Sequence, residues 1–394
     1  MSKLDELIQE LCPDGVEFCP LEQCCNILDR KRKPVTKSAR EAGDYPYYGA
    51  NGIQDYVSDY IFDGTFILVG EDGSVITDRG TPVVTWASGK IWVNNHAHII
   101  EESGDVLLRY LYHYIQTIDV SPLIHGNIPK LTGGDFKALQ IPVPPLPVQR
   151  GIVRILDNFT ELTAELTAEL TARKQQYMYY RDKLLTFENF TEWRTLDDII
   201  VSLNTGLNPR QFFKLNSDDA HNYYVTIREI QNGTIVVSDK TDRINDDALR
   251  LCNNRSNLEV GDVLFSGTGT IGETAVISEP PTNWNIKEGI YVIKPRKEVL
   301  HSRYLMYILR TDALRSAIFK KVAGGTVKSI PMAEMRNLRV PVPSLKIQKR
   351  LVEVLDNFDT LCTDLSSGLP AEIEARQKQY EYYRDKLLSF EEKI

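Results

Sequence analysis

The sequence has no apolar run of the roughly eighteen residues that a membrane-spanning helix needs. Its first residues, MSKLDELIQELCPDG, lack the apolar core of a signal peptide. The six cysteines form no CxxC or CxxH pair, so we interpret them as reduced thiols rather than as a metal site. These absences predict a cytoplasmic protein that does not enter a membrane.

Signatures of catalysis are also missing. The sequence has no phosphate-binding loop of the form GxxxxGKS or GxxxxGKT. It has no Asn/Asp-Pro-Pro-aromatic motif of the methyltransferase type, because Glu279-Pro280-Pro281-Thr282 does not match it. We therefore predict no catalytic residue, no metal and no cofactor on this chain.

Positive charge is in the minority, with a net charge of −8 over 394 residues. This argues against a free-standing, non-specific nucleic-acid binder, which is normally basic. It leaves room for a protein that reads bases locally while a partner supplies much of the phosphate contact. One basic cluster precedes Pro34, and it is either a solvated loop or a phosphate-contacting patch: Arg30, Lys31, Arg32 and Lys33, with Lys37 and Arg40 nearby.

What the sequence does contain is a long helical stretch that occurs twice, over Ile141–Phe187 and Val340–Phe390. Such a long-period duplication indicates a modular architecture. The second copy carries four extra residues in its middle, near Gly368-Leu369-Pro370, where we expect a kink. The copies share two motifs: LDNF at Leu156–Phe159 and Leu355–Phe358, and YYRDKLL(T/S)F at Tyr179–Phe187 and Tyr382–Phe390.

The helical copies have coiled-coil spacing, and the first contains tandem TAEL units over Thr163–Leu170. Leucines four residues apart drift around the helix, so each unit changes the helix length by about 6 Å and rotates one end against the other. The leucines that set the length of this helix are therefore Leu162, Leu166 and Leu170. The simplest arrangement is antiparallel pairing of the two copies within one molecule; the alternative is two unrelated surface helices.

Two strand-rich regions, about 21–140 and 196–339, precede the two helical copies. Each is predicted to contain short strands, then a helix (Val106–Thr117 or Arg303–Phe319), a glycine-bearing loop and a proline-rich linker. Asp72-Gly73 is predicted to form a tight hairpin turn. The predicted strands are 56–57, 66–69, 74–77, 83–86, 91–93 and 98–100 in the first region, and 224–227, 234–237, 262–265, 274–277 and 289–293 in the second.

This module order, the shared motifs and the TAEL repeats resemble the specificity subunit of Type I restriction–modification systems, in the subfamily with TAEL repeats in its central spacer. The resemblance implies an α+β fold. Two homologous strand-rich target-recognition domains (1–145 and 191–343) are separated by two long helices (146–190 and 344–394) that form an antiparallel coiled coil with an approximate two-fold axis.

The resemblance further implies a non-catalytic DNA-recognition subunit. Each target-recognition domain would read one half of a bipartite site in double-stranded DNA. The helices would set the gap between the halves and dock two N6-adenine methyltransferase (modification) subunits, which restriction and motor subunits join. S-adenosylmethionine, ATP and Mg would bind only those partner subunits.

Two motifs invite other interpretations. Gly267–Gly272 matches the dinucleotide-binding pattern GxGxxG, but a predicted strand follows it where that pattern needs a helix. A hairpin that faces DNA fits better, and there Thr268 and Thr270 either contact DNA or only shape the turn. His96 and His98 lie two residues apart on a strand with no second ligand cluster in the sequence, so a zinc site is disfavoured.

Base reading needs polar side chains on loops that can enter a groove. Each candidate could also be an ordinary surface residue, and the loops 126–130 and 325–329 are favoured because they fall at equivalent positions. The DNA-contact candidates are Arg32, Lys33, Tyr47, Tyr48, Asn51, Asn94, Asn95, Asn127 and Lys130 in the first region, and Arg228, Gln231, Asn232, Thr268, Thr270, Lys287, Thr326, Lys328 and Ser329 in the second.

Two alternative functions stay open at this point. One is a methylation-only or phase-variable orphan specificity subunit, which the neighbouring genes would reveal. The other belongs to a different class, a coiled-coil adaptor whose strand-rich modules bind protein or glycan, and a gel-shift experiment with partner-loaded DNA would separate it. The identity of the recognised bases depends on loop geometry, which periodicity does not determine.

Overall fold

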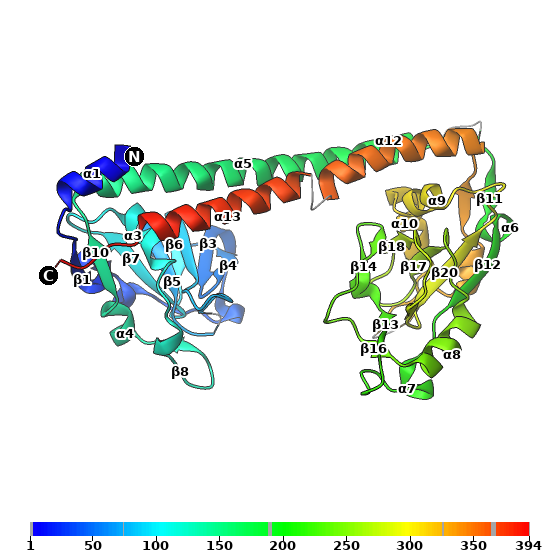
Figure 1. Ribbon diagram of the computed structural model, residues 1–394, viewed down its shortest axis with the longest axis horizontal. Helices are drawn as coiled ribbons and strands as arrows, with labels where there is room; N and C mark the ends of the chain where they lie inside the picture. The colour runs from blue at the N-terminus through cyan, green and yellow to red at the C-terminus, as the bar shows by residue number, and fades with distance from the viewer. Residues whose placement is uncertain (1–2, 74, 188–190, 325–326, 364–367, 394) are drawn as a thin grey trace. The chain divides into compact units, whose positions relative to one another are not determined.

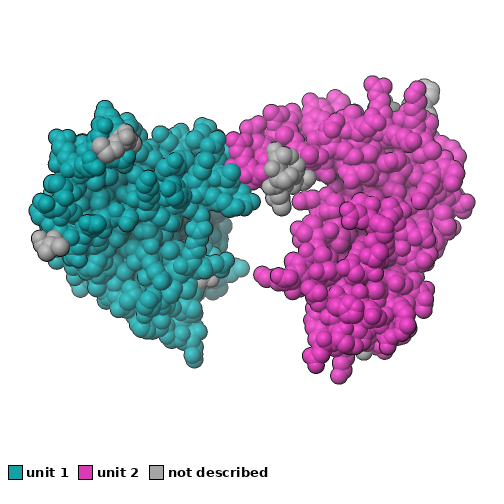
Figure 2. Space-filling model, viewed as in Figure 1, with its two compact units in different colours: residues 1–167, 373–394 teal, residues 168–372 magenta. Residues whose placement is uncertain are grey.

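The computed structural model describes residues 3–73, 75–187, 191–324, 327–363 and 368–393 (Figure 1). The chain divides into two compact units, one made of residues 1–167 and 373–394 and the other of residues 168–372 (Figure 2). Each unit therefore holds one strand-rich region and a part of each helical copy. The finer segment boundaries at 145, 190 and 343 stay a prediction. None of the described helices is long and apolar enough to cross a membrane.

Unit 1 is built on a six-stranded sheet in the order β2-β7-β5-β6-β3-β4. Only the β3–β6 pair is parallel. The central strand β5 is almost fully buried over Phe66–Gly70, because α3 and the long helices cover one side of it. The strands are β2 (Cys25–Ile27), β3 (Ala42–Gly49), β4 (Gly52–Val57), β5 (Phe62–Gly70), β6 (Val84–Val93) and β7 (Ala97–Glu102), and the helix α3 is Leu108–Ile115.

Three predictions for unit 1 are wrong in detail. The runs 83–86 and 91–93 form the single strand β6, which pairs with β5 along its length. Of the predicted strand 74–77, Ser74 lies outside the described residues, and Ile76 forms only an isolated bridge with Pro82. Asp72-Gly73 does not join two consecutive strands, because β5 ends at Gly70 and β6 begins at Val84.

Unit 2 contains a four-stranded sheet, β12-β20-β17-β18, and a three-stranded sheet, β16-β13-β19. The predicted helix Arg303–Phe319 is two helices, because the Thr311 hydroxyl caps the second by accepting from the Leu314 amide at 3.4 Å. Helix α8 was not predicted. The elements are β12 (Ile200–Thr205), β13 (Asn222–Val225), β16 (Arg243–Ile244), α8 (Asp246–Ser256), β17 (Val263–Ser266), β18 (Thr274–Val276), β19 (Trp284–Ile286), β20 (Ile290–Pro295), α9 (Ser302–Leu309) and α10 (Asp312–Phe319).

The two units repeat one internal frame. In each, an entry strand pairs antiparallel with the proline-rich linker, so that Phe18 lies opposite Pro142 and Trp193 opposite Pro341. A buried tyrosine, Tyr110 of α3 in unit 1 and Tyr304 of α9 in unit 2, donates its hydroxyl to the carbonyl of that linker proline, at 2.9 Å in both units. The remaining elements are α1 (Lys3–Leu11), β1 (Glu17–Pro20), α2 (Leu21–Cys24), β8 (Ile124–His125), β9 (Lys130–Leu131), α4 (Gly133–Lys137), β10 (Gln140–Val143), β11 (Trp193–Thr195), α6 (Leu196–Ile199), α7 (Pro209–Phe212), β14 (Ile230–Gln231), β15 (Thr234–Ile235), α11 (Met332–Arg336) and β21 (Arg339–Pro341).

The helical copies are α5 (Leu146–Leu184), α12 (Leu345–Thr363) and α13 (Leu369–Leu387). In unit 1, Phe159 of α5 stacks on Tyr383 of α13, with ring centroids 5.3 Å apart. In unit 2, Tyr180 of α5 stacks on Phe358 of α12 at 6.4 Å. The early part of each copy thus pairs with the late part of the other, which is the exchange that antiparallel pairing of duplicated helices requires, and the predicted antiparallel coiled coil is confirmed.

The second helical copy is interrupted where the extra residues fall. Helix α12 ends at Thr363 and α13 begins at Leu369, while the intervening 364–367 lie outside the described residues. Pro370 occupies the first turn of α13, where its missing N–H has no intrahelical partner to lose. The expected kink is therefore an end of one helix and the beginning of the next.

Candidate DNA interface

Equivalent loops lie at the end of β5 in unit 1 and at the end of β17 in unit 2. In unit 1, Lys130 pairs with His125 and bridges to Asp72, which follows β5. In unit 2, Ser329 pairs with Ala323 and bridges to Thr268, which follows β17. The next residue in each loop donates its amide to the strand end at 2.9 Å, Leu131 to Glu71 and Ile330 to Gly267. The predicted correspondence of these two loops is confirmed.

The tips of these loops carry exposed side chains. Asn127 and Lys130 are exposed in unit 1, and Lys328 is exposed in unit 2. Thr326 lies outside the described residues. Sequence reasoning missed Ile128 and Val327, which are 69% and 62% exposed at corresponding positions of the two loops. A β-branched apolar residue in a glycine-bearing loop was the available signal, since such residues contact thymine methyl groups.

In unit 2 the fold brings predicted residues from separate segments together. Arg228, Thr268 and Lys287 line one cavity of about 500 Å³ with Asp242 and Glu288. Arg228 is also within 3.4 Å of the Asp242 carboxylate, which holds the guanidinium at the rim. Both signs of charge in one cavity suit donors and acceptors on base edges better than a run of phosphates.

The GTGTIG motif forms the turn between β17 and β18, which are antiparallel, so a strand follows it as predicted. The Gly269 amide donates to the Lys328 carbonyl at 2.9 Å and so ties this turn to the neighbouring loop. Thr270 is exposed in the same turn. Gln231 and Asn232 are exposed in the β14–β15 hairpin, and the Gln231 amide donates to the Arg228 carbonyl at 2.9 Å.

Several candidates of unit 1 are buried instead. The sequence YYGANG was read as a loop, but it forms the β3–β4 hairpin, with Asn51 exposed in its turn. Tyr47 and Tyr48 are 1% and 7% exposed, and Asn94 is 2% exposed with its amide on Gln54 at 3.3 Å. Pairing of β3 with both β4 and β6 puts these side chains inside, so they cannot reach DNA in this conformation and we leave them out of the interface.

The basic cluster divides into exposed and buried members. Lys33 is exposed, and its ammonium lies 5.9 Å from the centre of the Trp92 ring beside a cavity of about 510 Å³. Arg32 is 12% exposed, and its guanidinium contacts Glu71 at 2.6 Å and Asp29 at 3.5 Å. Of the two readings of this cluster, a solvated loop and a phosphate patch, neither describes Arg32.

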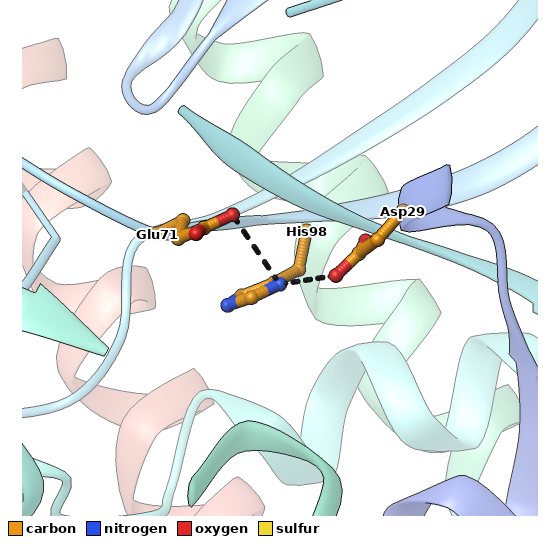
Figure 3. Close-up of side chains that lie close together, drawn as sticks. All are labelled: Asp29, Glu71 and His98. Carbon is orange, nitrogen blue, oxygen red and sulfur yellow. Dashed lines mark hydrogen bonds and ion pairs between the residues drawn. The ribbon is translucent and has the colours of Figure 1, made fainter. Parts of the chain in front are cut away.

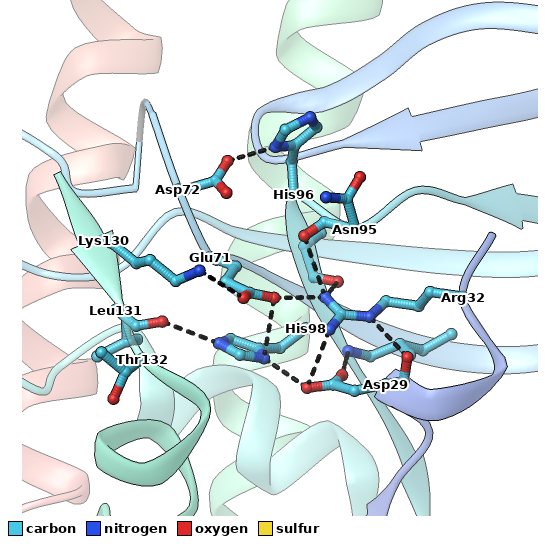
Figure 4. Close-up of polar contacts among 12 residues, drawn as sticks. Asp29, Arg32, Glu71, Asp72, Asn95, His96, His98, Lys130, Leu131 and Thr132 are labelled. Atoms are coloured by element: carbon cyan, nitrogen blue, oxygen red, sulfur yellow. Dashed lines mark hydrogen bonds and ion pairs between the residues drawn. The ribbon is translucent and has the colours of Figure 1, made fainter. Parts of the chain in front are cut away.

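Arg32 belongs to a cluster that could be mistaken for a metal site (Figure 3). One ligand atom from each of Asp29, Glu71 and His98 lies within 4.8 Å of the others. Figure 4 shows, however, that the Arg32 guanidinium and the Lys130 ammonium already neutralise these carboxylates. Burial raises the pKa of Asp29, but hydrogen bonds from His98 and the Ile99 amide, together with the nearby charge of Arg32, outweigh burial and leave that pKa below its usual value.

The two histidines of the disfavoured zinc motif face different partners. His96 is exposed and paired with Asp72. His98 is buried, stacks on Phe136 with ring centroids 4.1 Å apart, and contacts Asp29 at 2.6 Å. His96 precedes β7, which begins at Ala97, whereas His98 lies within the strand, so the two rings contact different carboxylates.

The leucines predicted to set the helix length lie along α5. Leu162 is 45% exposed, and Leu166 and Leu170 are half-buried. Leu170 packs against the core of unit 2. The Thr163 and Thr167 hydroxyls donate to carbonyls four residues back, at 2.8 and 2.7 Å, so the TAEL units are regular helix.

The comparisons with known proteins match this duplicated arrangement. The model of the family "Type I restriction modification DNA specificity domain" matches twice, over residues 13–173 and 191–375. The chain belongs to this family. A putative type I restriction enzyme specificity subunit of Haemophilus influenzae is 35% identical, over 95% of this chain and 96% of its own length. The EcoR124I/EcoR124II specificity subunit of Escherichia coli is 35% identical over 80% of each chain.

Solved structures share the fold. The S subunit of a type I restriction–modification system from M. genitalium has a TM-score of 0.54 at 13% identity, covering 95% of this chain and 96% of its own. A chain from a structural study of type I complex assembly has a TM-score of 0.56 at 15% identity, covering 96% and 98%. The resemblance inferred from the sequence is therefore confirmed, as are the α+β fold and the role of a non-catalytic DNA-specificity subunit. Membership of the TAEL-repeat subfamily stays a prediction.

Proposed function

We propose that each unit of this DNA-specificity subunit reads one half of a bipartite site in double-stranded DNA. The supporting observation is the pair of equivalent loops on one repeated frame, which bridge through Asp72–Lys130 in one unit and Thr268–Ser329 in the other. Side chains at matching positions differ while the backbone connections are kept. Two readers of different sequences need that combination.

The reading surfaces follow from exposure. In unit 1 we assign them to Lys33, Asn51 and Asn95 with the loop side chains Asn127 and Lys130, all of which are exposed. In unit 2 the corresponding surface is the cavity that Arg228, Thr268 and Lys287 line, together with Gln231, Asn232, Thr270, Lys328 and Ser329. Ile128 and Val327 add apolar contact at the loop tips.

The helices carry two matched docking patches for two modification subunits. Tyr179 and Tyr382 are each 62% exposed, and each packs edge-on against the next tyrosine, at 5.4 and 5.3 Å between ring centroids. Exposed aromatic side chains of this kind are typical anchors of protein interfaces. Because the patches are duplicates, they suit two copies of one partner, and restriction and motor subunits join through that assembly.

Replacing one exposed tyrosine tests the docking patches. Tyr179→Ala or Tyr382→Ala should reduce the complex from two modification subunits to one, and the double variant should bind neither, as native mass spectrometry would show. Full binding of two subunits by the double variant would exclude these patches as the docking sites.

We place S-adenosylmethionine, ATP and Mg on the partner subunits, and the complex in the cytoplasm with the DNA. The proposal is tested by mapping N6-methyladenine in cells that express this chain with its methyltransferase partner. A split motif with one methylated adenine in each half is expected. Active methylation without any split motif would refute it. A motif without restriction activity would indicate the methylation-only form.

A further inference from the structure

The two units use different side chains at one equivalent position to hold the DNA-facing loop. His98 on β7 pairs with Val69, the penultimate residue of β5. Tyr291 on β20 pairs with Phe265, the penultimate residue of β17. The Nε2 atom of His98 lies 3.1 Å from the Leu131 carbonyl at the base of the loop. The Tyr291 hydroxyl donates to the Ile330 carbonyl, the matching atom of unit 2, at 2.5 Å.

In unit 1 this contact is part of a dense ionic cluster. Arg32 contacts Glu71 at 2.6 Å, and Lys130 contacts the other oxygen of Glu71 at 3.2 Å. His98 contacts Asp29 at 2.6 Å. Arg32 also donates to the Asn95 carbonyl at 3.5 Å. The cluster therefore joins the basic turn, the strand end, the turn at Asn95 and the loop that carries Lys130.

In unit 2 the matching positions are neutral. Gly267 stands where unit 1 has Glu71, and a Cβ atom there would lie 2.5 Å from the Tyr291 ring. Thr205 stands opposite Tyr291 in the β12–β20 register, where Asp29 follows β2 in unit 1. Its hydroxyl donates to the Ile290 carbonyl at 3.0 Å. The bulky tyrosine and the glycine thus replace the charged cluster.

The charges in unit 1 are complementary. Arg32 and Lys130 face the Glu71 carboxylate, and the two ring nitrogens of His98 contact the Asp29 carboxylate and the Leu131 carbonyl. The side chains of Arg32, Glu71 and Asp29 are 12%, 13% and 18% exposed, so water screens them weakly. Removing one member leaves a partly buried charge without its partner.

We propose that Arg32, Glu71 and His98 are positioning residues that hold the unit 1 loops in the geometry for base reading, and that Tyr291 does the same for unit 2 without charge. The inference rests on the proposed function, since it needs each unit to read one half-site. It reassigns Arg32 from a candidate DNA contact to a residue that acts through Glu71. The other reading, a phosphate contact, makes opposite predictions.

The test uses the complex with its modification subunits and duplexes in which one half of the mapped motif is randomised at a time. Arg32→Lys keeps the charge but loses the forked guanidinium contacts. It should lower discrimination between correct and incorrect bases about tenfold in one half only. Glu71→Gln should relax the same half. Tyr291→Phe should relax the other half.

Arg30→Gln is the matched control, because Arg30 is exposed in the same turn. It should leave base discrimination unchanged. The slope of affinity against salt distinguishes the two roles of Arg32: a lost phosphate contact lowers the slope by about one in Arg32→Gln, whereas a lost positioning contact leaves it unchanged. If the Arg32→Lys variant melts at a lower temperature, the base discrimination of Glu71→Gln, which keeps the shape of the side chain, decides between the two roles.

Four outcomes overturn the inference: wild-type discrimination in both Arg32→Lys and Glu71→Gln, equal loss in both halves, relaxation by Arg30→Gln, or a lower salt slope in Arg32→Gln. A wild-type complex that binds no split site overturns the proposed function itself, and this inference with it. The two failures are distinct because the first set requires a wild-type complex that reads both halves.

Discussion

Replacing a buried glutamine should show how strongly the strand-rich region of each unit is attached to its long helix. Gln149 in the first turn of α5 is fully buried, and its amide makes three hydrogen bonds to backbone groups. It accepts from the Leu107 amide at 2.9 Å and donates to the carbonyls of Asp105 and Pro144 at 3.0 and 2.8 Å. These bonds join the start of the α3 region, the linker and α5. Gln149→Met keeps the length of the side chain and removes all three.

The expected cost follows from those three bonds. A neutral hydrogen bond contributes about 1 kcal/mol net, and a buried group left without a partner adds to that cost, so we expect a loss of about 3–5 kcal/mol. For a unit of this size the melting temperature should fall by roughly 10 °C. Gln348 makes the same contacts in unit 2, with three bonds of 2.8 Å. Gln348→Met should therefore cost as much in the other unit.

Chemical denaturation of the full chain measures the loss, and hydrogen exchange assigns it to a unit. Gln140→Met is the matched control, because that amide is exposed and makes one bond to a carbonyl, at 2.9 Å. It should change stability by less than about 0.5 kcal/mol. A loss of less than about 1 kcal/mol in the free energy of unfolding of Gln149→Met would show that these bonds do not attach the strand-rich region to the helix.

Three further outcomes are expected. Inserting one TAEL unit after Leu170 adds about 6 Å of helix, so methylation mapping should show a longer gap between unchanged half-sites; altered half-site bases would contradict the helical spacer. Gly267→Ala places a Cβ atom 2.5 Å from the Tyr291 ring, so it should lower stability by about 1–3 kcal/mol in denaturation and weaken only one half-site. Burial lowers the pKa of His113 below 6.5, so the neutral form stabilises the fold above that pH and stability falls as pH drops. The melting temperature should therefore decline from about pH 7 to pH 5, and less steeply in His113→Tyr, which copies Tyr307 of unit 2; an unchanged decline would refute the assignment.

Local patterns predicted the elements whose contacts are local. Helix α5 (Leu146–Leu184) lies within the helical stretch predicted over Ile141–Phe187, because helical periodicity depends on residues in consecutive turns. The hairpin at Gly267–Gly272 was predicted from the strand-like residues that follow it. Helix α8 was missed because its apolar residues are few and its start depends on the Asn245 cap, which accepts from the Ala248 amide at 3.0 Å.

The candidate site, in contrast, depends on contacts between distant segments, which local patterns do not predict. Tyr47, Tyr48 and Asn94 have the residue types of base readers, yet the pairing of β3 with β6 buries them. That pairing joins segments more than forty residues apart, and no local pattern encodes it. Ile128 was missed for a different reason, because only polar side chains were expected to read bases.

The sequence by itself determined the duplication, the coiled-coil spacing of the helices and the family, because shared motifs in the two halves of the chain are recognised without knowledge of contacts. Only the tertiary structure decided which polar side chains face solvent and which charges neutralise one another. Arg32 and Glu71 are plain in the sequence, but their 2.6 Å contact exists because β2 and β5 both pair with β7. A side chain's charge is a property of its residue, whereas its partner is set by strand register.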